Sequence, residues 1–518
     1  MKGSPNRESL SAQTAYLSSF VNMEEIYVPI LGSVSPILLG LYAVLTLFIA
    51  SKLLTKRRPR NAPPSATLGV PILGTYIEFA KNPVDFIDRC RKKYGNIYTV
   101  SMLHKKLTFL LGPEVSAPFF KSDDSVMSQP EVYGFMTPVF GKGVVYDAEP
   151  KKRTQQYQHM AKGLKSASLR AYIPKIEKEC HDYMKRWGAG GEVDLLEALS
   201  ELTILTSSRC LHGDDVRENL FAEVSKLYHD LDKGVTPLSF FFPYAPTEAH
   251  KLRDNARVEM VKIFSSVIAE RRRRKDTSDA TDILQVFIDM TYKDGTKLTD
   301  SEVVGLLIAL LFAGQHTSSI SSTWTAMFLA HNPRCLDEVM KEQKKILGEG
   351  MGSSELNFDD VGEMEYLQNC VKESLRMHPP LIMLMRMAMK DVKTTLNGKT
   401  YTIPKGDIVI TSPAVASRMD SVFKNPDKFE PERFMAGREE QKVPFSYLGF
   451  GAGMHQCMGQ QFGLLQVKTI VSILLRNYKV EPLTTDFPEP DYTAMVVGPK
   501  NHCKVKLTKL PTSKIPNA

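Results

Sequence analysis

The chain has 518 residues, of which 43% are hydrophobic and 24% charged, a balance typical of a globular protein with a large buried core. Its formal net charge of +8 favours acidic surfaces, but no nucleic-acid-reading motif or basic segment interleaved with aromatic residues accompanies it, so no nucleic-acid partner is expected. Seven widely spaced cysteines, an odd number, argue against a disulfide framework and fit a reducing compartment.

An uncharged, largely apolar segment runs from Ile26 to Ser51, long enough for a helix to cross about 30 Å of hydrocarbon. The basic cluster that follows at 56–60 predicts a cytosolic C-terminal side. A cleaved signal peptide is the rival, but its apolar region would be shorter and would end at a small-residue cleavage site. We expect a luminal tail at 1–25, a single-pass transmembrane anchor at 26–54, a basic, proline-containing hinge at 55–64 and one large body at 65–518.

The body begins with strand patterns and continues with helical ones. Alternating residues at 97–103 predict a strand, and 107–113 its hairpin partner. Helical periodicities follow at 215–232, 250–274, 301–331 and 334–347, and short strands are predicted at 400–403 and 408–410. The basic run 271–275 is expected to be a solvated helix end or loop. The expected fold is mainly α with small β-sheets, in a single domain.

One helical segment combines an apolar stretch with a polar one. Residues 306–313 are almost entirely apolar, which predicts burial, and Gly314 then precedes a polar run with His316 and Thr317. Hydroxyl side chains compete for the carbonyls of the preceding turn, so we expect a loosened ladder here, open to oxygen and an ordered water.

Two further segments contain candidate functional residues, one with charged side chains and one with a cysteine. Glu373 and Arg376 share a helix face, and with Arg433 they predict a buried ion network, although an isolated pair of this kind is more often a surface pair. Cys457 lies in a loop with three glycines, directly before an apolar run at 462–467. Free amides and a helix end would favour its thiolate.

The surroundings of Cys457 narrow the metals that it can bind. No other cysteine lies between Cys370 and Cys503, which disfavours a zinc or iron–sulfur cage. A single thiolate in a glycine-rich loop that admits a flat ligand suits haem iron. The alternative from the loop alone is an inert, buried cysteine.

Together these segments resemble the signatures of the cytochromes P-450: the haem-binding loop at 450–459, the Glu-x-x-Arg pair, the arginine segment at 431–434 and the oxygen-activating helix at 313–317. The resemblance implies the cytochrome P-450 fold and haem b, iron protoporphyrin IX, with Cys457 as its axial thiolate. It also implies electrons from NADPH through NADPH-cytochrome P-450 reductase and a single-pass protein of the endoplasmic reticulum membrane with a cytosolic catalytic domain. Thr317 would support oxygen activation, and Glu373, Arg376 and Arg433 would set the cysteine loop.

A narrower resemblance lies in the segment from Tyr133 to Asp147, which is similar to the signature region of the sterol 14α-demethylases. The Gly-Gln-His-Thr-Ser run at 314–318 is the second hallmark of that group. The resemblance implies removal of the 14α-methyl group of a sterol precursor in three successive oxidations, to alcohol, aldehyde and finally carbon–carbon cleavage with release of formate.

The narrower resemblance also implies site residues. Partners of the haem propionates would be Tyr133, Tyr146, Arg386 and His455. The sterol cavity would be lined by Phe135, Met136, Phe140, Ala313, Leu381, Met383 and Met495. An apolar lining suits a sterol, which offers one hydroxyl and a rigid hydrocarbon surface.

His316 stands where most P-450 enzymes carry a carboxylate. Histidine relays protons near neutral pH but needs a partner that resets it, and the sterol 14α-demethylases suggest Asp232. The alternative is that His316 is a hydrogen-bonded core residue without a proton role.

The chain also departs from the family pattern. Met454 and Gln456 stand where relatives usually carry arginines, and the segment 155–159 lacks the basic residue expected on the helix after Tyr146. We therefore expect haem retention to depend more on Tyr133, Tyr146 and Arg386, and the redox-partner face to be less basic.

The resemblance also implies a substrate preference. In the sterol 14α-demethylases, a phenylalanine at the position of Phe135 goes with sterols that bear one methyl at carbon 4, such as obtusifoliol, and a smaller aliphatic residue goes with lanosterol or eburicol. Two other functions are weighed against this one: a microsomal P-450 that oxidises drugs or fatty acids, and a haem-bearing sterol-binding protein without turnover.

Overall fold

The computed structural model describes residues 26–28, 32–34, 58–67, 73–102, 105–274 and 282–511. The chain forms two units, 1–60 and 61–518. In the first unit, strands β1 (Ile26–Val28) and β2 (Gly32–Val34) pair antiparallel. They occupy the start of the predicted anchor at 26–54, so a helix does not begin at Ile26. The remainder of that anchor lies outside the described residues, and the anchor stays a prediction.

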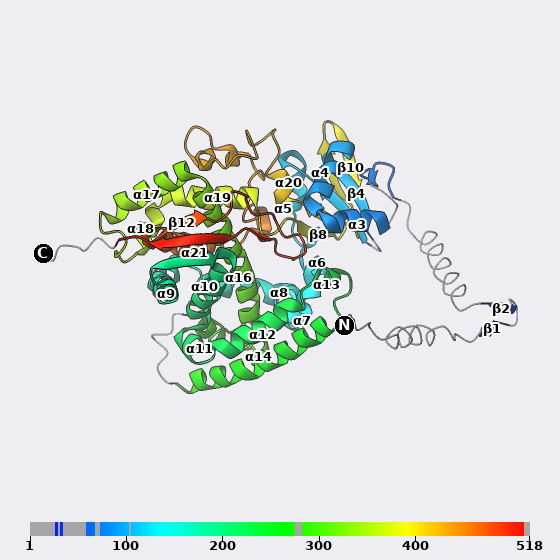
Figure 1. The fold of residues 1–518 in the computed structure, drawn as a ribbon. Helices are drawn as coiled ribbons and strands as arrows, with labels where there is room; N and C mark the ends of the chain where they lie inside the picture. Colours follow the sequence, from blue (N-terminus) through cyan, green and yellow to red (C-terminus); the bar gives the residue numbers. More distant parts are fainter. Residues whose placement is uncertain are drawn as a thin grey trace, which may run out of the picture. The chain divides into compact units, whose positions relative to one another are not determined.

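The second unit is mainly helical, with a sheet region at one side (Figure 1). Its longer helices are α3 (Leu73–Lys81), α4 (Pro83–Tyr94), α5 (Pro113–Lys121), α8 (Pro150–Lys162), α9 (Ser166–Met184), α10 (Leu195–Ser207), α12 (Phe221–Lys233), α14 (Glu248–Arg273), α16 (Asp300–His331), α17 (Pro333–Leu347), α19 (Glu365–Met377) and α21 (Gln460–Asn477). Its shorter helices are α6 (Pro130–Tyr133), α7 (Thr137–Phe140), α11 (Asp214–Asn219), α13 (Pro237–Phe241), α15 (Ile283–Ile288), α18 (Phe358–Glu363) and α20 (Pro413–Ala416).

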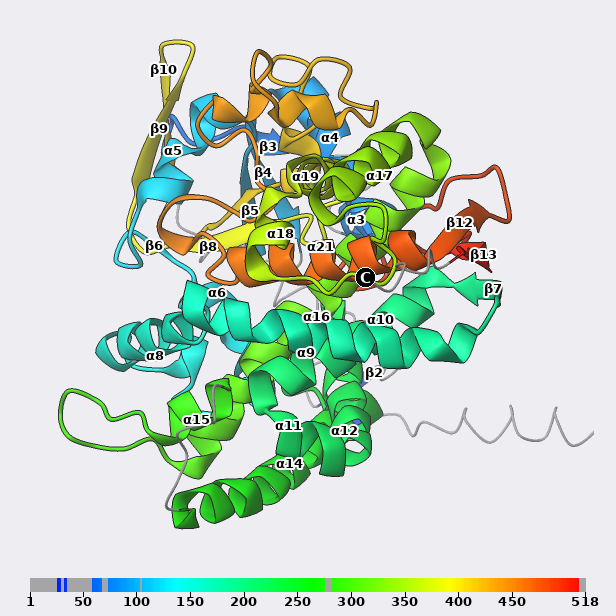
Figure 2. The same cartoon turned by 90° about the vertical axis from the view of Figure 1, so that its left-hand side faces the viewer.

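Helix α16 is the central element of this unit. Its start is fixed by a capping box, in which Thr299 and Glu302 bond each other's backbone N–H groups. It is apolar on nearly all sides and packs against α10, α14, α19 and α21 (Figure 2). Among the helices of the described ranges it alone is long and apolar enough to cross a membrane, but 72% of its apolar window is buried inside the protein. It is therefore a core helix.

The predicted helix at 301–331 is confirmed, but the expected loosening at Gly314 is wrong. Helix α16 runs unbroken through this residue. The hydroxyls of Thr317 and Ser321 donate to carbonyls one turn earlier, each over 2.6 Å, without opening the ladder.

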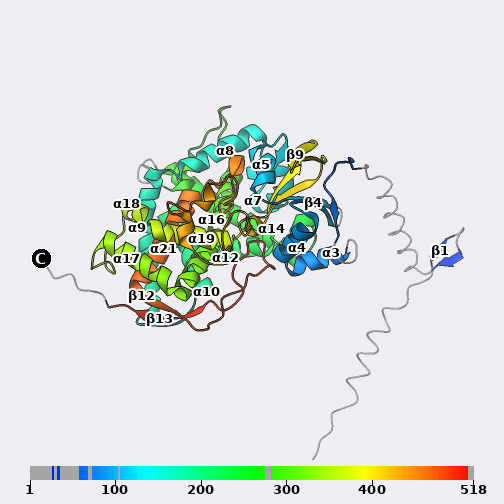
Figure 3. The same ribbon diagram turned by 90° about the horizontal axis from the view of Figure 1, so that it is seen from above.

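Within the described residues, the strands of the body form three sheets. A six-stranded sheet has the order β3 (Ser65–Ala66), β4 (Ile97–Met102), β5 (Lys105–Leu110), β11 (Ile408–Thr411), β8 (Leu384–Ala388) and β6 (Met127–Ser128). A hairpin joins β9 (Val392–Leu396) and β10 (Lys399–Ile403), and a third sheet has the order β12 (Tyr478–Pro482), β13 (Lys504–Lys509) and β7 (Gly190–Asp194). The predicted hairpin at 97–113 is confirmed as β4 and β5, with Ile97 opposite Leu110. Helices α3, α4 and α5 lie beside the large sheet (Figure 3).

Two sequence-based expectations for the helical part need correction. The periodicity at 215–232 forms two helices, α11 and α12, because the chain leaves helical geometry at Leu220. In the basic run 271–275, Arg271 is buried, since its guanidinium pairs with Asp215 at 2.6 Å and Asp282 at 2.7 Å. Only the arginines after it are exposed as expected.

Candidate functional site

Cys457 lies between a short turn at Gly453–His455 and helix α21. Its backbone N–H donates to the Phe450 carbonyl over 2.9 Å. Gly453 has a φ of +66°, and a Cβ there would lie 2.1 Å from the Phe120 carbonyl oxygen, so the loop requires glycine. Of the seven cysteines, all within the described ranges, only Cys457 is exposed. It is thus the one thiol accessible to a ligand.

The expected lowering of the Cys457 pKa by the loop amides is not seen in the protein alone. The surrounding loop partly desolvates the thiol, although its surface is accessible, and this desolvation raises its pKa; a backbone hydrogen bond from Gly459 acts in the opposite direction. A bound metal would favour the thiolate, because the thiolate is the form that ligates metals.

The middle turns of α16 are less enclosed than the rest of the helix. The Ala313 side chain is exposed and Thr317 is partly exposed, whereas the residues at 303–311 and 318–329 are buried. A Cβ at Gly314 would meet no atom within 4 Å. Cys457 lies three residues before α21, a helix that packs against α16.

His316 and Asp232 come together as the sequence predicts. His316 Nε2 lies 3.1 Å from Asp232 Oδ1, which is carried by α12. The His316 ring is also 6.0 Å from the ring of Tyr228. The Asp232 side chain is 38% exposed, so it reaches solvent. The geometry thus offers a connection from solvent to α16, while its use as a proton relay stays a prediction.

Three predicted propionate partners also gather. Tyr133 ends α6, Tyr146 lies in the turn Val145–Asp147, and their rings stack with centroids 5.3 Å apart. Arg386 on β8 donates from Nη1 to the Met385 carbonyl, but its buried Nε has no partner. Burial lowers the pKa of Arg386 and raises those of both tyrosines. A buried guanidinium with a free N–H is suited to a carboxylate brought by a ligand.

Sequence reasoning missed a second layer of this cluster. Arg153 of α8 is buried and pairs with Asp124 over 2.8 Å, and His455 Nε2 lies 3.4 Å from the same carboxylate. Burial raises the pKa of Tyr157, on the same helix, to about 12. The sequence pattern predicted no basic residue at 155–159 of this helix, and Arg153 lies just before that segment. The basic run at 151–153 was the available signal.

The predicted apolar lining is brought together in part. Phe135 and Phe140 are each 7% exposed. The Phe135 ring lies 5.8 Å from Phe240, and the Phe140 ring lies 6.1 Å from Phe312 of α16. Met136 packs on the main core and Met383 on the cluster that contains Tyr133 and Phe240. Leu381 is 45% exposed and Met495 half-buried, so their place in a cavity wall stays a prediction.

The predicted ion network is buried and complete. Glu373, Arg376 and Arg433 are all fully inaccessible. Arg376 binds Glu373 through Nε at 2.8 Å and Nη2 at 2.9 Å, and Arg433 Nε binds it at 2.9 Å. The remaining guanidinium nitrogens donate to backbone carbonyls of Ser417, Lys424, Asn425 and Lys428 and to the Glu440 carboxylate.

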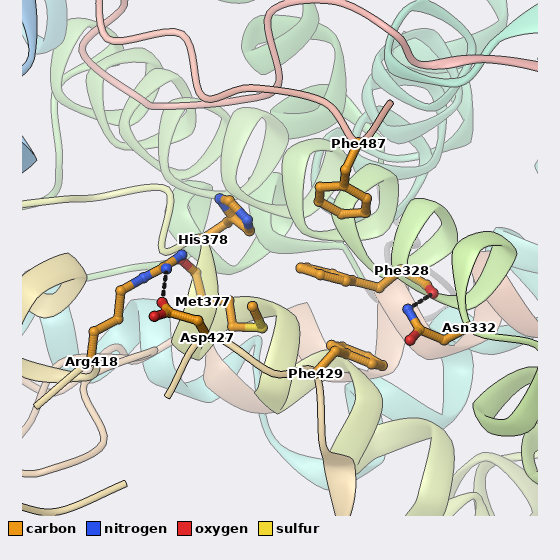
Figure 4. A pocket seen from close by; sticks show the side chains of 8 residues that line it. All are labelled: Phe328, Asn332, Met377, His378, Arg418, Asp427, Phe429 and Phe487. Carbon is orange, nitrogen blue, oxygen red and sulfur yellow. Dashed lines mark hydrogen bonds and ion pairs between the residues drawn. The ribbon is translucent and has the colours of Figure 1, made fainter. Parts of the chain in front are cut away.

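A hollow of about 400 Å³ lies at the C-terminal ends of α16 and α19 (Figure 4). Its lining is formed by Phe328, Asn332, Met377, His378, Arg418, Asp427, Phe429 and Phe487, none of them a predicted site residue. Arg418 is paired with Asp427 at 2.8 Å, and His378 stacks on Trp324 with ring centroids 3.9 Å apart. Burial lowers the pKa of His378 to about 3, so this histidine is neutral at pH 7.

Comparison with known proteins agrees with this geometry. A family model described as Cytochrome P450 matches residues 63–507. The fold is similar to that of the retinoic acid-bound cyanobacterial CYP120A1, with a TM-score of 0.76 and 21% identity over 88% of this chain and all of that one.

Three relatives show the range of sequence similarity. A sterol 14-demethylase of Arabidopsis thaliana is 46% identical over 90% of this chain and 96% of its own length. An obtusifoliol 14-alpha demethylase of Triticum aestivum is 47% identical over 86% and 97%, respectively. A lanosterol 14-alpha demethylase of Mus musculus is 40% identical over 85% and 86%. The family model and these relatives cover most of the chain, and the chain belongs to the cytochrome P450 family.

Proposed function

We propose that this cytochrome P450 is a sterol 14α-demethylase that acts in sterol biosynthesis. It removes the 14α-methyl group in three oxidations that use O2 and NADPH-derived electrons and release formate. The observation that carries the proposal is the similarity of 85–90% of the chain to relatives that are named sterol, obtusifoliol or lanosterol 14-demethylases.

The family's haem-thiolate cofactor fits the residues present. Cys457 is the accessible thiol, and the buried Arg386 Nε lacks a protein partner. We propose haem b, with Cys457 as the iron ligand and with Tyr133, Tyr146, Arg386 and His455 toward the propionates. When bound, the haem supplies the oxygen-activating chemistry.

The chain's own residues orient the sterol and deliver protons. The apolar side chains around Phe135 and Phe140 exclude water and bind the ring system, since apolar burial contributes roughly 25 cal/mol per Å². Thr317 lies on the partly exposed stretch of α16, where it would support oxygen activation, and His316 passes protons inward. Asp232 resets His316, because its carboxylate is within hydrogen-bond distance of the ring and open to solvent.

Phe135 favours a sterol with one methyl at carbon 4. Two obtusifoliol demethylases, of Triticum aestivum and Sorghum bicolor, are 47% and 45% identical to this chain, against 40% for the mouse lanosterol enzyme. We expect faster turnover of obtusifoliol than of lanosterol, because a bulky ring at this position leaves less room for a second methyl. The reverse order in a competition assay would refute this preference.

The remaining parts of the proposal concern the surroundings of the enzyme. Residues 26–54 would anchor the protein in the endoplasmic reticulum membrane, and the hinge at 55–64 would lead to a cytosolic catalytic body at 65–518. NADPH-cytochrome P-450 reductase would be the electron donor. Deletion of the first 57 residues is expected to move the protein from the membrane fraction toward the soluble one.

The deciding experiment is reconstitution of the full-length protein with reductase, NADPH and a panel of sterols. Formate release together with the 14-demethylated sterol supports the proposal. A spectral response to sterols without formate would indicate a binding protein. Turnover of fatty acids or drugs with no response to sterols would indicate another microsomal P-450.

A further inference from the structure

The turn that carries Tyr146 has an unfavourable backbone conformation. Val145 has a φ of +48° and Gly143 a φ of +72°. Glycine adopts positive φ readily, whereas a β-branched valine does so rarely, because its side chain crowds the backbone. Such a conformation persists only where its surroundings hold it, and it often accompanies a functional constraint.

The Asp147 carboxylate accepts the Gly143 N–H over 2.7 Å within this turn, and one side chain from outside the turn, Gln156, binds it from both sides. Gln156 of α8 is completely buried, and its Oε1 accepts the N–H of Val145 over 3.0 Å. Its Nε2 donates to the Gly143 carbonyl over 2.8 Å and to the Tyr292 hydroxyl over 3.0 Å. The amide thus bonds the backbone on each side of Val144 and uses its donors fully.

The segment before the turn is held independently. Arg257 of α14 donates from Nη2 to the Phe140 carbonyl and to the Ser301 carbonyl, both over 3.1 Å. A Cβ at Gly305 of α16 would lie 2.2 Å from the same Phe140 oxygen, so this part of the loop sits directly against α16. With its start fixed in this way, the remaining freedom of the loop lies in the turn that Gln156 holds.

Tyr146 follows the strained residue immediately. Its ring stacks on Tyr133 and lies 6.1 Å from Phe140, between the predicted propionate partners and the apolar wall. A change of Val145 to negative φ would redirect the chain and displace this ring. We infer that Gln156 is a positioning residue that locks the turn at 143–147 and so presents Tyr146 to the haem. The inference depends on the haem of the proposed function but not on the sterol.

The test measures haem release from the full-length holoenzyme to an excess of apomyoglobin, without sterol or reductase. Gln156→Met is expected to release haem about tenfold faster, as expected when a hydrogen bond to a charged group is lost. Gln158→Met is the matched control, because Gln158 is exposed on the same helix. It should release haem at the wild-type rate.

A double-mutant cycle separates positioning from general loosening. If Gln156 acts through the Tyr146 hydroxyl, Gln156→Met should raise the haem-release rate of the Tyr146→Phe variant by less than about twofold. Val145→Gly should recover part of the loss in the Gln156→Met background, because glycine adopts the same φ without steric conflict. An unchanged release rate in Gln156→Met, or the same tenfold factor in both backgrounds, would overturn the inference.

A milder variant keeps the test decisive if Gln156→Met does not fold. Tyr292→Phe removes the hydroxyl that accepts from Gln156 and should accelerate haem release about threefold, again with no further effect in Tyr146→Phe. A rate equal to that of the wild type would count against the inference. Failure of formate release with an intact Gln156 effect would instead reject only the sterol reaction.

Discussion

Two groups of buried arginines in this protein differ in how fully their guanidinium groups are hydrogen-bonded. Every guanidinium nitrogen of Arg376 and Arg433 donates to Glu373, Glu440 or a backbone carbonyl. Arg386 is also buried, yet its Nε has no partner. A buried donor without an acceptor is unfavourable, and native proteins rarely leave one. The protein alone therefore satisfies the hydrogen bonds of the first group, whereas the second group needs a ligand to satisfy them.

The carboxylates show the same difference. Glu373 accepts from two arginines and from the Glu430 N–H, so one anion joins two segments far apart in sequence. Around Arg386, the nearby carboxylate Asp124 is already paired with Arg153 and accepts from the Gln129 N–H. That group keeps an excess of positive charge, which suits the two carboxylates of a porphyrin.

Substitutions in the fully hydrogen-bonded group of Glu373, Arg376 and Arg433 should reduce stability most. Glu373→Gln is expected to lower the free energy of unfolding by about 3–5 kcal/mol, because it leaves the buried Arg376 without its counter-ion and removes one of the carboxylates of Arg433. Glu365→Gln, at an exposed position of the same helix, should change it by less than about 0.5 kcal/mol. Thermal unfolding of both variants checks this contrast, and equal midpoints would remove the distinction between the two groups.

The His316–Asp232 pair lies between these extremes, since it is internally bonded yet open to solvent. His316→Ala and Asp232→Asn should each lower kcat by about 100-fold, a typical effect of losing a proton-transfer group. Sterol affinity, measured by spectral titration, should change little. Asp230→Asn is the control, because Asp230 pairs only with exposed Lys233 in the described contacts of α12. A loss of sterol binding in parallel with kcat would contradict a proton role.

A substitution of Arg386 should change haem retention and not the stability of the fold. Arg386→Met is expected to accelerate haem release by about 10- to 100-fold through loss of a charge-assisted bond. Its apoprotein should be no less stable than the wild type, since a buried, incompletely paired cation is removed. Haem transfer kinetics and chemical unfolding of the apoprotein measure the two quantities. Destabilised apoprotein with unchanged haem release would reverse the assignment.

His378 gives the smallest effect and involves no ion pair. Because burial lowers its pKa to about 3, from an ordinary 6.5, the unfolded chain binds a proton that the folded chain refuses between these values. Stability should fall as the pH drops through this window, by at most about 1.4 kcal/mol per pH unit. His378→Phe keeps the stack on Trp324 and should show a smaller decrease in melting temperature from pH 7 to pH 5. An identical decrease in both proteins would exclude this origin.

The sequence predicted contacts best for residues whose type alone restricts their environment. Glu373 and Arg376 share a helix face, and their burial follows once Arg433 joins them. The pairing of His316 with Asp232 came from the family resemblance, since no local pattern joins residues 84 positions apart. Cys457 is the accessible thiol, as a ligand site requires, while its role as the haem ligand stays a prediction. Desolvation raises its pKa instead of lowering it.

The residues that were missed have no distinctive type or spacing. Gln156 and Arg153 sit in a polar segment that reads as a solvated helix. Only the packing of α8 against the loop at 143–147 and against Asp124 buries them. Such features arise from tertiary contacts, which a local sequence window does not contain.

The most direct test of the central claim is a mass balance in the reconstituted full-length enzyme with obtusifoliol, reductase and NADPH. The account predicts one formate and about three NADPH for each 14-demethylated sterol, and no formate when Cys457 is replaced by serine. Consumption of NADPH with a sterol that keeps its 14α-methyl carbon, or formate release that survives Cys457→Ser, would contradict it.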